Sequence, residues 1–221
     1  IKHTAPDTAE TNATDNNDGV TVVVSPAADT SADTVNVTLS AIGSHVDANY
    51  GLHTLDLGNY ETINLSNKKG TVGGSEVTAN EVSTLTSSLA TTVAVTGDAN
   101  LTLGSITGGA MTSFDASALA GTLTATFATA DKITAKAATK NTTFNFGTTL
   151  DNNDTVVGGA GTADEITAEF TGLTATTGKL TISDVETLDI NTSGSNTIDL
   201  SSVTGLKKLE VGSNTQTIKG L

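Results

Sequence analysis

The chain contains no cysteine and no tryptophan, and aromatic residues make up only 3% of its 221 residues. The absence of cysteine excludes disulfide bonds and thiol chemistry. So few rings argue against a thick core of large side chains, and we expect a thin core of stacked Val, Ile and Leu. The sequence also has no run of about 18 apolar residues, so it predicts no membrane insertion.

Arginine is absent too, so the 10 basic residues are all lysine, against 24 acidic residues and a net charge of −14. Nucleic acids bind to clustered cations, so we expect no nucleic-acid partner. Repulsion between the acids opposes a compact state unless cations screen or bind them. The composition therefore predicts a protein adapted to high ionic strength, to bound Ca²⁺, or to both.

Threonine is abundant instead, at about one residue in five, and it favours strands because it branches at Cβ, as valine does. A short phrase of alternating polar and apolar residues recurs along the chain. Such alternation is typical of a strand with one buried face. The clearest copies of the phrase lie at residues 33–37, 53–57, 61–65, 186–190 and 196–200.

The phrases follow one another at short intervals, and near the C-terminus Leu188, Ile198, Leu209 and Ile218 lie about 10 residues apart. This spacing predicts an all-β fold. Two architectures fit it: a β-sandwich of antiparallel hairpins, and a β-solenoid whose short parallel strands stack coil upon coil. Near-identical phrases favour the solenoid, because like residues then pack on like residues.

One loop, at residues 151–164, combines carboxylates, amides and glycines in the order DNNDTVVGGAGTAD. Oxygen ligands on a glycine-rich loop suit Ca²⁺ rather than zinc or copper. The alternative is a polar turn without an ion, because Gly-Gly and Asn-Asp also mark turns. The predicted calcium ligands are the side chains or carbonyl groups of Asp151, Asn153, Asp154, Gly159, Gly161 and Asp164.

The same four letters, DNND, occur at residues 15–18, again before β-branched residues. Asp15 and Asp18 are therefore a second candidate pair of calcium ligands. Residues 1–18 show no apolar period and are interpreted as an extended arm or linker. We expect a β-rich assembly region at 19–146 and a solenoid-like region with the calcium loop at 147–221. Within the former, apolar spacing at 76–90 predicts a short helical stretch.

Three stretches resemble bacterial surface-layer proteins related to the repeats-in-toxin family. They are FDASALAGTL at 114–123, GGAGTADEI at 158–166 and ISDVETLDI at 182–190. The resemblance implies an exported protein that folds where Ca²⁺ is plentiful. It also implies self-assembly into a lattice at the cell surface, with a surface polysaccharide as a possible anchor.

The sequence has no nucleophile elbow and no phosphate-binding loop, and we expect a structural protein rather than an enzyme. An alternative within the structural class is a subunit of a fibrous adhesin or of an extracellular matrix filament. A second alternative is a β-helical polysaccharide-degrading enzyme. The absence of arginine and the scarcity of aromatic rings disfavour it, because grooves for acidic sugars usually carry both.

Overall fold

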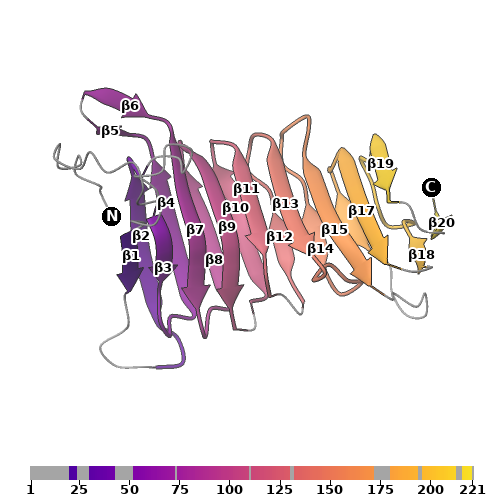
Figure 1. The fold of residues 1–221 in the computed structure, drawn as a ribbon, viewed down its shortest axis with the longest axis horizontal. Coiled ribbons are helices and arrows are strands. Elements are labelled where there is room, and N and C mark those ends of the chain that lie inside the picture. Colours follow the sequence, from indigo (N-terminus) through magenta and orange to yellow (C-terminus); the bar gives the residue numbers. More distant parts are fainter. Residues whose placement is uncertain are drawn as a thin grey trace, which may run out of the picture.

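The computed structural model describes residues 20–23, 30–42, 52–72, 74–109, 111–129, 132–171, 180–193, 196–212 and 216–220. These residues form strands and connecting turns, with no helix among them, and so none that could cross a membrane. Most of the strands belong to two long parallel sheets that enclose one apolar core (Figure 1). The all-β prediction is therefore confirmed for this part of the chain.

The nine-stranded sheet contains most of the odd-numbered strands, and each strand is parallel to its neighbours. Its order follows the sequence from one end of the molecule to the other (Figure 1). The strands are β1 (Val20–Val23), β3 (Leu52–Asp56), β7 (Ala79–Ser87), β9 (Asn100–Gly108), β11 (Leu123–Phe127), β13 (Thr142–Gly147), β15 (Glu165–Thr171), β17 (Thr187–Ser193) and β19 (Lys208–Val211).

The seven-stranded sheet is formed by even-numbered strands and is also parallel throughout. The chain alternates between the two sheets as far as β17, so each coil over this range contributes one strand to each sheet. The strands are β2 (Thr34–Ser40), β4 (Thr62–Lys68), β8 (Thr92–Gly97), β10 (Ser113–Leu119), β12 (Thr134–Lys136), β14 (Thr155–Val157) and β16 (Thr181–Ser183).

Two small sheets complete the described part of the chain. Strands β18 (Asn196–Asp199) and β20 (Gln216–Lys219) pair in parallel, whereas β5 (Gly70–Val72) and β6 (Ser75–Val77) form an antiparallel hairpin that projects from one end (Figure 1). That hairpin is the one antiparallel pair among the described strands. The solenoid prediction is confirmed, and the sandwich alternative, which requires antiparallel hairpins, is wrong.

The coil is about twice as long as the interval between phrases, because each coil holds two strands. Leu188 of β17 pairs in register with Leu209 of β19, and Ile198 of β18 pairs with Ile218 of β20. Phrases about 10 residues apart therefore face different sheets, and phrases about 21 residues apart stack directly.

Apolar side chains of successive coils stack in register and fill the space between the sheets. Most of these side chains are aliphatic, and in the middle coils an alanine lies next to a phenylalanine, so the core stays thin, as the sequence predicts. One ladder of the nine-stranded sheet is Leu52, Val82, Leu103, Ala125, Phe144, Ile166, Leu188 and Leu209. One ladder of the seven-stranded sheet is Val35, Ile63, Val93, Phe114, Ala135, Val156 and Ile182.

The helical stretch expected at 76–90 is wrong, because β7 occupies most of it. Strand β7 pairs with β3 on one side and with β9 on the other, so its main-chain groups are used by the sheet. Val82 and Leu85 are both buried although they lie three residues apart, because Ser83 and Thr84 both face outward. A spacing of three residues is also that of apolar residues on one face of a helix. Hydroxylated and β-branched residues have poor helix propensity, so the sheet prevails.

The nine-stranded sheet continues across residue 147, since β13 is bonded to β11 before it and to β15 after it. The arm expected at 1–18 lies outside the described residues.

Candidate functional site

Asp154, a predicted calcium ligand, is a buried hydrogen-bond acceptor at a corner of the solenoid. Its side chain is 2% exposed. Oδ1 accepts a bond of 2.8 Å from the N–H of Ile133, and Oδ2 accepts one of 2.8 Å from the N–H of Asp151. Because Ile133 precedes β12 and Asp154 precedes β14, the carboxylate braces two adjacent coils.

Asp164 has the same role on the opposite sheet, with a side chain that is 1% exposed. Oδ1 accepts a bond of 2.7 Å from the N–H of Thr142, one coil earlier. Oδ2 accepts a bond of 2.9 Å from the N–H of Gly159 within its own loop. The N–H of Asp164 in turn donates to Oε2 of Glu186 at 2.9 Å, which links the corner to the following coil.

Asp151 and Asn153 bond to each other at the surface. The N–H of Asn153 donates to Oδ1 of Asp151 at 2.7 Å, and the amide nitrogen Nδ2 donates to Oδ2 at 3.2 Å. The three acids of this loop do not form a group in which carboxylate oxygens from all three come within 4.8 Å of one another. Calcium binding by the loop stays a prediction, and Asp15 and Asp18 lie outside the described residues.

The glycines of this loop let adjacent coils approach closely. A Cβ added at Gly158 would lie 1.7 Å from the carbonyl oxygen of Asp184, in the next coil. One added at Gly159 would lie 1.7 Å from the carbonyl oxygen of Ala138, in the previous coil. A Cβ added at Gly161 would lie 2.8 Å from Oδ1 of Asp164. None of the three has a positive φ, so close approach, rather than a left-handed turn, requires glycine here.

Burial raises the pKa of both Asp154 and Asp164 above 3.8. In each case desolvation is the largest cause. The nearby charge of Asp151 adds to the rise at Asp154, and that of Glu186 adds to the rise at Asp164. The main-chain N–H groups oppose the rise in both, but do not outweigh burial.

We expect the melting temperature to rise as the pH is lowered from neutral through the folded-state pKa of Asp154 and Asp164. The folded-state pKa of Asp154 and Asp164 exceeds the unfolded value, so the folded chain binds protons more tightly. This tighter binding stabilises the folded state. The stabilisation is complete below the unfolded pKa and is lost as the pH rises through the folded pKa. Circular dichroism melts across this range would measure it.

Asp154→Asn and Asp164→Asn are the controls for this pH prediction, because each removes one titrating group and keeps one of the two oxygen acceptors. Their melting temperatures should depend less on pH than that of the parent. A parent melting temperature that is constant or falls over the same range would contradict the prediction.

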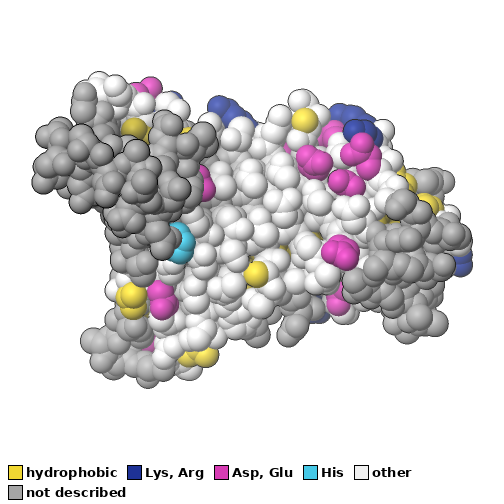
Figure 2. All heavy atoms as spheres, viewed as in Figure 1, with side chains coloured by type: hydrophobic (Ala, Val, Ile, Leu, Met, Phe, Trp, Pro, Cys, Tyr) yellow, Lys and Arg dark blue, Asp and Glu magenta, His cyan; other side chains and the backbone are white. Residues whose placement is uncertain are grey.

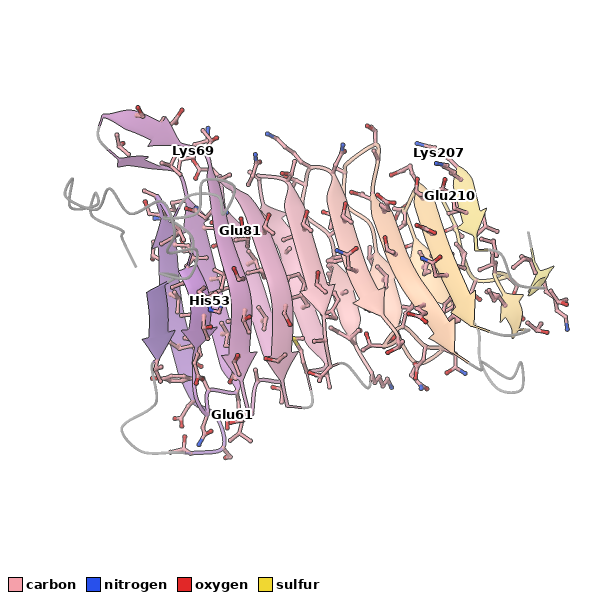
Figure 3. The ribbon with its side chains drawn as sticks, viewed as in Figure 1. His53, Glu61, Lys69, Glu81, Lys207 and Glu210 are labelled. Atoms are coloured by element: carbon pink, nitrogen blue, oxygen red, sulfur yellow. The ribbon has the colours of Figure 1, made fainter. Side chains whose placement is uncertain are left out.

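A second group of acids lies on the outer face of the nine-stranded sheet, near its C-terminal end. Carboxylate oxygens of Glu165, Asp189 and Glu210, on β15, β17 and β19, all lie within 4.8 Å of one another. Nζ of Lys208 bonds to Oε1 of Glu210 at 2.7 Å. Figure 2 shows acids gathered at this end of the face, and Figure 3 labels Glu210 there. We call Glu165, Asp189 and Glu210 the carboxylate cluster.

The sequence pattern places Asp189 in the strand phrase at 186–190 and does not bring it together with the other two acids. Asp189 and Glu210 pair in register across β17 and β19, and Glu165 lies on the next strand, β15. The coil length of about 21 residues is the signal that relates Asp189 to Glu210. The hydrogen bond to Glu210 and the charge of Glu210 are the main causes that raise the pKa of Lys208, and the charges of Glu165 and Asp189 raise it further.

Comparison with known proteins gives no match: no protein-family model fits the chain, and no curated protein and no solved structure is significantly similar to it. The resemblance to surface-layer proteins therefore rests on the three sequence stretches alone. It stays a prediction, whereas the solenoid fold rests on the strand pairing.

Proposed function

We propose that this chain is a structural extracellular protein that assembles with copies of itself into a calcium-stabilised layer on a bacterial cell surface. The observation that carries the proposal is the carboxylate cluster. It places three acids from three successive coils together in a chain of net charge −14. A divalent cation there would relieve repulsion between coils and would connect strands that lie far apart in the sequence.

The fold supports a structural role because its faces are long, regular sheets built from repeated coils. Solenoid stability is a sum over coils and the interfaces between them. A cation that joins β15, β17 and β19 would therefore stabilise interfaces directly. Oxygen-only ligands suit Ca²⁺, and extracellular calcium modules bind at about 10⁻⁴–10⁻³ M. Occupancy would then follow the calcium concentration outside the cell.

Calcium is expected to raise the melting temperature of the purified chain. At a tenfold excess over its dissociation constant, each site contributes about 1.4 kcal/mol to the free energy of unfolding. Calorimetric titration measures binding, and thermal melts with calcium and with chelator measure the stabilisation. Equal melting temperatures under both conditions, with no heat of binding, would contradict calcium stabilisation.

Variants separate the two candidate calcium sites. Asp189→Asn removes one acid of the carboxylate cluster, and Asp151→Asn alters the loop at 151–164. Glu169→Gln is the matched control, because it removes one charge from β15 at an exposed position outside the cluster. The cluster is supported if only Asp189→Asn reduces the calcium-dependent stabilisation, and the loop is supported if Asp151→Asn does so.

Electron micrographs of the purified protein with calcium and with chelator test the assembly itself. A surface-layer protein should give two-dimensional sheets that dissolve on chelation. Threads instead of sheets would indicate the filament alternative. Isolated particles under both conditions would count against both forms of assembly.

A further inference from the structure

The outer faces of the two sheets differ in charge. On the strands of the nine-stranded sheet whose side chains are described, outward acids far outnumber the single base, Lys208. The acids are Asp56, Glu81, Glu165, Glu169, Asp189 and Glu210. On the described strands of the seven-stranded sheet, the outward charged residues are Asp115, Lys136 and Lys68. The seven-stranded sheet is thus the face on which two negatively charged copies can meet without repulsion.

The outward residues of the seven-stranded sheet form two regular ladders. The first presents a hydroxyl group at every strand and consists of Thr34, Thr62, Thr92, Ser113, Thr134, Thr155 and Thr181. The second ladder lies two residues further along each strand. It consists of Asn36, Asn64, Ala94, Asp115, Lys136, Val157 and Ser183.

In the second ladder, the residues on the two sides of the gap between β10 and β12 match in kind: charged next to the gap and apolar beyond. Asp115 and Lys136 flank that gap and form an ion pair of 2.9 Å between Oδ2 and Nζ. Beyond them lie two apolar residues, Ala94 and Val157. Consider a two-fold axis that runs parallel to the strands at this gap, in the plane where two copies meet. It would bring a second copy face to face with the first, with the order of its ladder reversed. Asp115 would then face the partner's Lys136, and Ala94 would face the partner's Val157.

We propose that a second copy of this chain docks on the outer face of the seven-stranded sheet, about a two-fold axis between β10 and β12. The inference rests on the proposed self-assembly and names the surface that carries it. Oδ1 of Asp115 accepts bonds from the N–H and the hydroxyl of Ser117, at 3.0 and 2.6 Å. These bonds fix the carboxylate, so the central charges are preorganised for a partner.

The size of the face sets the strength of the contact. Seven strands at 4.7–4.9 Å spacing span about 29 Å, and strands of about five residues are about 16 Å long. The face therefore covers on the order of 450 Å² per copy, below the roughly 800 Å² of a standard interface. A single contact of this kind is weak, and repeated contacts in an assembly would supply its stability.

Charge exchange between two variants tests the contact. Asp115→Lys places two lysines at the centre of the face, and Lys136→Asp places two aspartates there. Each variant alone should lose self-association, by about tenfold or more in dissociation constant, through like-charge repulsion. Their mixture should associate as a heterodimer, because opposite charges then face each other. Sedimentation velocity over a concentration series, with calcium present, measures both effects.

Thr124→Lys is the control for charge exchange, since it adds a lysine to the outer face of the nine-stranded sheet. It should leave association unchanged. Folding should survive in all variants, because exposed ion pairs contribute only about 0–1 kcal/mol to stability. Self-association of both single variants at the parental level, or a mixture that fails to restore it, would overturn this inference and leave the proposed function standing. A parent that never associates would overturn both.

Cysteine substitutions provide a second, independent test of the proposed axis, since the sequence has no cysteine of its own. Ala94→Cys and Val157→Cys lie on β8 and β14, which are separated by β10 and β12. The two positions in one chain are therefore about 14 Å apart, beyond the roughly 7 Å that a disulfide spans between Cα atoms. A mixture of the two variants should form a disulfide-linked dimer under mild oxidation, and either variant alone should not. The absence of the mixed dimer would overturn the proposed axis.

Discussion

Gly159→Ala is expected to destabilise the folded chain by about 3 kcal/mol or more, at the upper end of the cost of overpacking. The added Cβ would lie 1.7 Å from the carbonyl oxygen of Ala138 and 2.9 Å from its carbonyl carbon. Both obstacles are main-chain atoms of the neighbouring coil, so no side chain can rotate away. The coils would have to separate, and the bond from the N–H of Gly159 to Asp164 would be strained. Denaturant unfolding measures the change.

Gly212→Ala is the matched control for this substitution. Its added Cβ would meet Oδ1 of Asn191 at 3.1 Å, which is a side-chain atom, and Gly212 has no positive φ. Alanine also restricts the unfolded chain, a contribution of about 0.4–1 kcal/mol in favour of folding. We therefore expect a small effect of either sign. Similar stability of the two variants would show that the coils at Gly159 are not held in close contact.

The glycine loop shows how far sequence reasoning reaches here. Its letters, with acids and amides followed by glycines and a further acid, predict calcium ligands. The structure gives the same residues mechanical roles: Asp154 and Asp164 brace coils through main-chain N–H groups, and Gly158 and Gly159 admit neighbouring backbone. Both roles need the same residue types, so composition alone cannot separate them.

Alternation of polar and apolar residues predicted strands correctly because burial of one face requires it locally. The stacking partners are harder to predict, since they depend on the length of each coil. Ile63 and Val93 stack across the coil that contains the β5–β6 hairpin, whereas Val93 and Phe114 stack across a coil without one. A fixed period therefore fails at the hairpin, and the carboxylate cluster is visible only once the register is known.

Phe144→Ala is expected to cost about 3–5 kcal/mol in the free energy of unfolding, the usual range for removing a buried phenylalanine. Phe144 is 1% exposed and lies in the ladder between Ala125 and Ile166. Its ring centroid is 6.1 Å from that of Phe114 and 5.7 Å from that of Phe127. Both neighbours belong to earlier coils, so the cavity would open between β13 and those coils.

The location of this cavity predicts a second consequence beyond lower stability. In a solenoid each coil contacts only its neighbours, so cooperativity depends on every interface along the stack. A weakened interface at Phe144 should divide one unfolding transition into two, with β13–β19 melting apart from the earlier coils. Hydrogen exchange on the variant would show protection lost in one half before the other. Thr143→Ala, on the outer face of the same strand, should keep a single transition. A Phe144→Ala protein that still unfolds in one step would mean that the main-chain ladders, and not the stacked rings, couple the coils.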